Sequence, residues 1–362
     1  MTKNDSISSW QTAILIFILF FANKILILPS LLYEQAGIWS FIAMIVSFVL
    51  EFGLLFLFFR LKKKFPTETF SQILSVSFGK FWKNFVLIFV MVFFLGKSIL
   101  LYNIGYIFFT NTVYKDASNM IFLVSFLPVV VYLCHAGIKV LGRTAQLFFP
   151  IVFVIVVFCL IVGVAGIDSV PILSDLNFLS LSGAWLKHLT AFGDTIFLFL
   201  IIDKIKIKKG QWKIVFSLAL ISAFLVTAIT VIFVFSFTYT SYMHPFALFE
   251  IMSYVQEFGG VGRIDLISMV VIILLTYFHL AIYLYGFTHC FKDVFKINTI
   301  YSYVSFFAFF LLMINYLILN LEKAIFFGEG FWPAFAFVSF VVVPLFVTIA
   351  LCKKRHREVD RE

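Results

Sequence analysis

The sequence consists largely of apolar stretches of about 20 residues, separated by short polar connections. An α-helix rises about 1.5 Å per residue, so about 20 residues cross a hydrocarbon core that is roughly 30 Å thick. The apolar stretches therefore predict an all-α polytopic membrane protein with about ten transmembrane helices. Residues 1–362 are expected to form one permease-like domain, in which residues 353–362 are a basic tail. The predicted spans, with boundaries good to about 2 to 4 residues, are 10–33, 38–59, 84–109, 120–134, 144–166, 186–202, 214–237, 264–288, 299–319 and 331–352.

The amino-acid composition indicates the same class. Hydrophobic residues make up 63% of the chain and charged residues 12%, about half the ~25% charged share of a soluble domain. A soluble fold cannot bury that much apolar surface, and disordered, collagen-like and disulfide-rich chains have other compositions. The formal net charge of +9 would indicate nucleic-acid binding in a soluble protein, so the position of the cations decides its meaning.

The cations are concentrated in every second connection. Of the 27 Lys and Arg residues, 21 lie in the termini and in alternate connections, 4 lie in the remaining connections, and Lys24 and Lys97 lie within spans. Because positively charged connections stay cytoplasmic, both termini are predicted to be cytoplasmic and no nucleic-acid partner is needed. Eight or twelve spans would preserve this parity. Residues 1–10 lack the features of a cleavable signal, so the first span is expected to remain in the protein.

Two long connections, 168–185 and 238–265, lie on the predicted outer side. The second contains the apolar segment PFALFEIMSYV, which is too short to span a membrane. This segment either lies along the membrane surface and covers an outer vestibule, or it is a plain amphipathic connector.

No pattern in the sequence is typical of catalysis or of a metal site. Its cysteines form no CxxC pair and have no His at metal-ligand spacing, so we interpret them as packing or lipid-facing thiols. Paired acids, HExxH and a Ser/His arrangement at usable spacing are absent from the sequence too. We therefore expect no enzyme, no metal and no cofactor. The cysteines concerned are Cys134, Cys159, Cys290 and Cys352.

Five titratable residues fall well inside the predicted spans: Lys24, Glu51, Lys97, Asp194 and His279. A charge at the centre of a membrane-spanning helix costs ~2.5 to 3.5 kcal/mol even on the lenient insertion scale, so each needs a partner, water or a neutral state. The two cations and two carboxylates can cancel one another. Glu51, Asp194 and His279 are candidates for proton coupling, whereas snorkelling or structural pairing is the alternative for Glu51 and Lys97, and a hydrogen-bonded structural role for His279.

Two spans carry signals for a broken helix. In FANKILILPS, Pro29 follows Lys24 by five residues and predicts a loosened helix around residues 22–26. In TAFGDTIF, Gly193 weakens the sixth span next to Asp194. Interrupted helices at membrane depth are tolerated where the freed backbone groups line a cavity or are buried in protein.

The broken spans are the first and the sixth, which are equivalent positions if ten spans divide into two sets of five. That arrangement is typical of inverted-repeat transporters, which bind solute at broken helices, and the repeat halves would be 8–166 and 186–352. Helix ends at such breaks suit a carboxylate on one side and an amine on the other, so a small zwitterion fits. Structural kinks without a ligand are the alternative.

The third span is less apolar than its neighbours around Lys97. Ser98, Tyr102 and Gly105 share one helical face by their spacing. This face either lines the same cavity or allows close helix packing through small residues.

Four segments together resemble the spore germination permease family, the B subunits of germinant receptors in the amino acid, polyamine and organocation transporter superfamily. They are ILILPSLLYEQAG, KKFPTETFSQILSVSFGK, GIKVLGRTAQLFFP and EFGGVGRIDLI. The resemblance implies a five-plus-five inverted repeat with broken helices 1 and 6, residence in the spore inner membrane, and a complex with an A subunit and a lipoprotein C subunit. It also implies recognition of a nutrient, an amino acid or a sugar, that triggers germination.

Carried over by position, the resemblance places the nutrient site at the two breaks and on the third span. The glycine-containing break usual in the family reads Ala22, Asn23 and Lys24 here, which leaves ion coupling open. A nutrient sensor and a proton-coupled amino acid transporter share this fold, so both hypotheses stand. The predicted nutrient-binding residues are Asn23, Lys24, Ile25, Pro29, Lys97, Ser98, Tyr102, Phe192, Gly193, Asp194 and Thr195.

Overall fold

The computed structural model describes residues 6–114, 119–167, 176–207, 210–259, 263–296 and 335–353. The predicted ninth span, 299–319, and all but the first residue of the basic tail lie outside these ranges.

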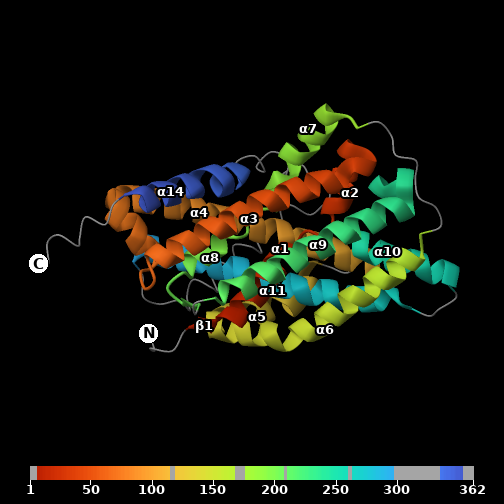
Figure 1. The fold of residues 1–362 in the computed structure, drawn as a ribbon. Helices are drawn as coiled ribbons and strands as arrows, with labels where there is room; N and C mark the ends of the chain where they lie inside the picture. The colour runs from red at the N-terminus through yellow and green to blue at the C-terminus, as the bar shows by residue number, and fades with distance from the viewer. Residues whose placement is uncertain are drawn as a thin grey trace, which may run out of the picture.

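The described chain is a bundle of α-helices whose long members run roughly alongside one another (Figure 1). Six described helical stretches are long and apolar enough to cross a membrane, and two shorter apolar helices accompany them. The protein is therefore a multi-pass membrane protein, as predicted. The helices are α1 (Ser9–Phe21), α2 (Leu28–Ala36), α3 (Ser40–Lys64), α4 (Phe70–Thr112), α5 (Asn119–Ala136), α6 (Ile138–Ala165), α7 (Phe178–His188), α8 (Ile196–Leu200), α9 (Trp212–Phe237), α10 (Ala247–Gly259), α11 (Asp265–Phe295) and α14 (Val343–Cys352).

Both predicted breaks are present. Residues 22–27 form turns between α1 and α2, and residues 192–195 separate the short helix η2 (Leu189–Ala191) from α8. Pro29 lies in the first turn of α2, where its missing N–H costs no hydrogen bond. It therefore starts a new helix after the break.

The sixth span begins earlier than predicted. Part of the expected connection 168–185 is helical, because α7 starts at Phe178 and leads into η2. The Asn177 side chain caps this helix by accepting hydrogen bonds from the Leu179 amide at 3.0 Å and the Ser180 amide at 3.3 Å, a common start signal.

The apolar segment in the second long connection forms α10. Its first turns are buried, with Leu248, Ile251 and Met252 at most 2% exposed. The Ala247 amide donates to the Leu26 carbonyl at 3.3 Å, so α10 is attached to the break in the first span. This hydrogen bond joins α10 to the break, while the covering of an outer vestibule stays a prediction.

The long helix α4 is divided by Gly79. Its 43 residues would extend roughly 65 Å, about twice a hydrocarbon core. Gly79 has φ +87 inside the helix, a value that favours glycine, and so separates a short leading helix from the third span.

A short parallel pairing that the sequence did not predict joins the start of the chain to the end of the sixth span. Strand β1 (Ile7–Ser8) pairs with β2 (Ile205–Lys206), and the Ile7 amide donates to the Lys204 carbonyl at 2.9 Å. This pairing and the end of α14 lie at the same end of the bundle, on the left in Figure 1.

Candidate functional site

The break in the first span places Lys24 inside the protein. Asn23 is 7% exposed and the Lys24 side chain is fully buried. Lys24 Nζ donates to the Leu19 carbonyl at 2.9 Å, a backbone acceptor of the last turn of α1. The freed backbone of this break is thus partly satisfied by a side chain of the break itself.

The break in the sixth span depends on a glycine. Gly193 has φ +89, and a Cβ at this position would lie 2.5 Å from Ser339 Oγ. Any other residue would be strained in the backbone and would overlap Ser339, a residue of the π-helical turn η4 (Val338–Val342). This close approach lets the chain turn and present Asp194 to the bundle interior.

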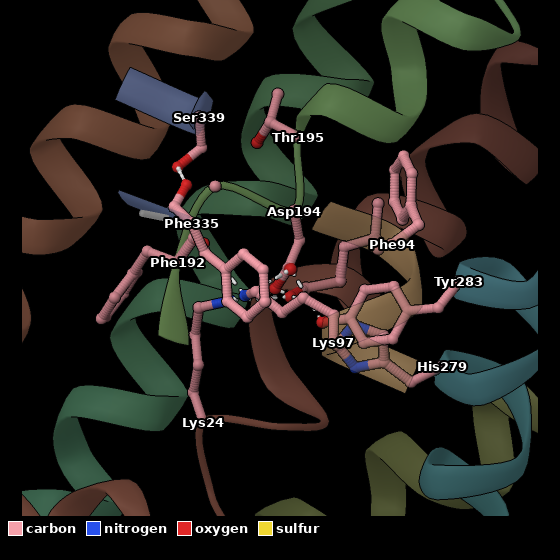
Figure 2. Close-up of polar contacts among 12 residues, drawn as sticks. Lys24, Phe94, Lys97, Phe192, Asp194, Thr195, His279, Tyr283, Phe335 and Ser339 are labelled. Carbon is pink, nitrogen blue, oxygen red and sulfur yellow. Dashed lines mark hydrogen bonds and ion pairs between the residues drawn. The ribbon is translucent and has the colours of Figure 1, made fainter. Parts of the chain in front are cut away.

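Asp194 is the centre of the site, and side chains from three other segments point toward it (Figure 2). Its Oδ2 accepts from Lys24 Nζ at 3.0 Å, and its Oδ1 accepts from Lys97 Nζ at 2.9 Å. The Tyr283 hydroxyl donates to Oδ1 at 2.7 Å, and His279 Nε2 lies 3.8 Å from Oδ2. One carboxylate therefore connects the first, third, sixth and eighth predicted spans.

Glu51, on α3, also binds the sixth-span break. Its Oε1 accepts from the Gly193 amide at 2.6 Å and from the Asp194 amide at 3.3 Å, and Oε2 accepts from the Thr195 hydroxyl. Lys24 Nζ lies 3.8 Å from Oε1. Glu51 is fully buried, so it pairs inside the protein and does not snorkel.

The four charges form one buried cluster. Lys24, Glu51 and Asp194 are 0% exposed and Lys97 is 1% exposed, and Lys97 Nζ also donates to the Phe192 carbonyl at 3.0 Å. Two cations and two carboxylates balance in formal charge. Removing one member of such a buried set leaves an uncompensated charge, which costs ~3–5 kcal/mol. The structure thus brings Lys24, Lys97, Phe192, Gly193, Asp194 and Thr195 together, with Glu51 and His279.

The polar face of the third span has a second role besides Lys97. Ser98 Oγ donates to the Phe94 carbonyl of its own helix at 2.7 Å, and the Tyr102 ring packs against Phe122 with centroids 5.2 Å apart. A Cβ on Gly105 would lie 3.2 Å from Thr276 of α11. Gly105 therefore allows close helix packing, one of the two alternatives, whereas a nutrient-binding role for Ser98 and Tyr102 stays a prediction.

Two predicted positions belong to the break without joining the charge cluster. Ile25 is 1% exposed among apolar neighbours, and Pro29 starts α2. Tyr283, which donates to Asp194, was not among the predicted site residues. Its four-residue spacing from His279 on α11 puts both on one helix face and was the available signal.

A small cavity lies next to the cluster, between the two breaks and the third span. It holds about 20 Å³, room for roughly one water molecule. Within the described residues, the Thr190 hydroxyl on its wall has no hydrogen-bond partner. The cavity is lined by Asn23, Ile27, Leu28, Leu31, Ile104, His188, Thr190 and Ala191.

Comparison with known proteins gives a family and a fold. The sequence profile of the family described as "Spore germination protein" matches residues 6–324. No curated protein matches the chain in sequence.

Solved membrane transporters have the same fold at low sequence identity. The structure of MhsT in complex with L-phenylalanine is 12% identical, with a TM-score of 0.70 over 96% of this chain and 89% of that one. Mhp1, a nucleobase-cation-symport-1 family transporter with bromovinylhydantoin bound, is 15% identical, with a TM-score of 0.66 over 96% and 78%. A manganese transporter from Eremococcus coleocola is 11% identical, with a TM-score of 0.63 over 94% and 76%. These likenesses confirm the predicted fold class.

Proposed function

Because the chain belongs to the spore germination protein family, we propose that it is the nutrient-sensing membrane subunit of a germinant receptor. A small nutrient such as an amino acid binds between the two breaks and the third span, and this binding triggers germination. A sugar is the other nutrient class that the family resemblance implies.

One observation carries this proposal: the buried cluster of Lys24, Lys97, Glu51 and Asp194 at the two breaks. Its ammonium and carboxylate groups are the partners that the two ends of a zwitterion require. The fold likeness to proteins bound to L-phenylalanine and to a hydantoin supports a small organic ligand.

Among the described residues, the cavity beside the cluster holds about 20 Å³, which is less than an amino acid occupies. Nutrient binding therefore requires a second conformation in which the cluster opens. A ligand shifts such an equilibrium only by its difference in affinity for the two states. Partner subunits would read the resulting change in population.

Location and partners follow from the family and from the charge pattern. We place the chain in the spore inner membrane with both termini cytoplasmic, in a complex with an A subunit and a lipoprotein C subunit. It is a binding protein that needs no cofactor and performs no catalysis.

The decisive experiment is reconstitution of the chain alone in liposomes. Accumulation of labelled amino acids is measured with and without a pH gradient, alongside binding of the same amino acids. A sensor binds its nutrient and accumulates none of it. Accumulation driven by the gradient would contradict the sensor hypothesis and indicate a proton-coupled amino acid transporter.

A further inference from the structure

Two polar side chains of α3 bind backbone groups just before and just after α8. At the start of α8, the Glu51 carboxylate accepts hydrogen bonds from the Gly193 and Asp194 amides at 2.6 and 3.3 Å. At the other end, Lys62 Nζ donates to the Ile202 carbonyl at 2.6 Å. A carboxylate thus binds donors at one end, and an ammonium binds an acceptor at the other.

The spacing of these groups along α3 matches the length of the segment that they bind. Glu51 and Lys62 are eleven residues, or roughly 16 Å, apart on one face of α3. Residues 193–202 of the broken span cover roughly 14 Å if helical. Between the two polar contacts, Phe58 packs edge-on against Phe199 with ring centroids 5.7 Å apart.

Helix α8 cannot hold its own conformation. It has five residues, with the non-helical residues 192–195 before it and turns at 201–204 after it, whereas isolated helices shorter than ~12–15 residues are marginal. Its end groups are freed at membrane depth, where each unsatisfied group costs several kcal/mol. The position of α8 therefore depends on the side chains that satisfy its ends.

We propose that Glu51 and Lys62 form a two-point clamp on α8 and act as positioning residues for Asp194. Because Asp194 belongs to the candidate nutrient site, the functional part of this inference rests on the proposed function. The clamp also connects that site to the pairing of β1 with β2, since Ile202, which Lys62 binds, lies three residues before β2.

A thermal double-mutant cycle in the purified full chain tests the clamp. Two substitutions eleven residues apart that share no contact should lower the Tm additively. If the clamp exists, either Glu51→Gln or Lys62→Met already loosens α8. The Tm decrease of the double variant is then expected to be clearly smaller than the sum of the single decreases.

Lys64 supplies a matched control on the same helix. Its Nζ donates to the carbonyls of Ala350, Leu351 and Lys353 at 3.1, 2.7 and 2.8 Å, so it holds the end of α14 and not α8. The Tm decreases of Glu51→Gln and Lys64→Met should add. Additivity in the Lys62 pair as well would overturn the clamp.

Thr195→Val replaces Glu51→Gln if the latter fails to fold, because it removes another hydrogen bond to Glu51.

The functional readout is the nutrient dose response of spores. Lys62→Met is expected to raise the half-maximal nutrient concentration several-fold at unchanged maximal response, and Lys62→Arg to restore it. Non-additive Tm decreases with an unchanged dose response would show that the clamp exists and that Asp194 is not part of the nutrient site. Additive Tm values would remove the clamp and leave the nutrient site untouched.

Discussion

The two breaks satisfy their freed backbone groups in different ways. In the first span, Lys24 reaches back five residues to the Leu19 carbonyl. In the sixth span, the Gly193 and Asp194 amides are bound by Glu51 of α3, and the Phe192 carbonyl is bound by Lys97 of α4.

This difference makes the sixth-span break the more dependent of the two. The first break carries one partner of its own, besides the Ala247 amide of α10 that binds the Leu26 carbonyl, so its backbone is partly satisfied wherever α1 moves. The second break keeps its geometry only while α3 and α4 stay in place. A change at the second break should therefore disturb more of the protein, and the same dependence suits it to report a bound nutrient.

The largest effect is expected for Asp194→Asn. It removes the carboxylate that Lys24 and Lys97 share, and an uncompensated buried charge costs ~3–5 kcal/mol. We expect a large Tm decrease in detergent and loss of the nutrient response in spores.

The control for this prediction is Asp194→Asn combined with Lys97→Met, which restores the charge balance of the cluster. The double variant should regain part of the Tm but none of the nutrient response. A wild-type Tm for Asp194→Asn alone would show that the carboxylate is not required to hold the two cations.

An intermediate effect is expected for Gly193→Ala. A positive φ and the overlap with Ser339 together cost about 2–4 kcal/mol. The matched change at the first break, Asn23→Ala, meets no positive φ and should cost about 1 kcal/mol. Thermal unfolding of the two variants measures the difference, and equal Tm decreases would contradict the contrast between the breaks.

The smallest effect is expected outside the membrane, for Arg263→Gln. Arg263 is 60% exposed and bonds Asp265 at 2.9 Å. The hydrogen bonds and charge of Asp265 raise the pKa of the Arg263 guanidinium. Because the pKa is raised in the folded state, the stabilising contribution is fully present below the unfolded pKa and is lost only as the pH rises through the folded pKa, far above neutral pH. The Tm of Arg263→Gln should thus be close to that of the wild type, with the same small difference at pH 6 and pH 9. A Tm decrease as large as that of Gly193→Ala would contradict this prediction.

The breaks themselves were predictable because their signals are local. Pro29 and Gly193 act on the backbone within a few residues of their own positions, so the sequence placed both breaks to within about one residue. The signal for the start of α7 was equally local, since Asn177 is a helix cap. It was not recognised because the spans were predicted only from apolar stretches of about 20 residues.

The partners of the breaks were not predictable in the same way. Glu51 and Asp194 are 143 residues apart in the chain, yet the Glu51 carboxylate accepts a hydrogen bond from the Asp194 amide. The pairing of β1 with β2 is also long-range, joining Ile7 to Ile205. Two-residue strands give no alternating pattern, so the sequence carried no signal for them.

The sequence by itself determined the membrane class, the approximate spans, the two broken helices and which titratable residues enter the bilayer, because hydrophobic length, proline, glycine and buried charge act through local physics. Only the tertiary structure decided that Asp194 is shared by Lys24 and Lys97, that Glu51 accepts from the amides of the sixth-span break, and that Gly105 lies close to Thr276. These outcomes depend on which helix faces meet. In hydrocarbon, every buried charge and freed backbone group must find a partner, and only the folded bundle fixes which one it finds.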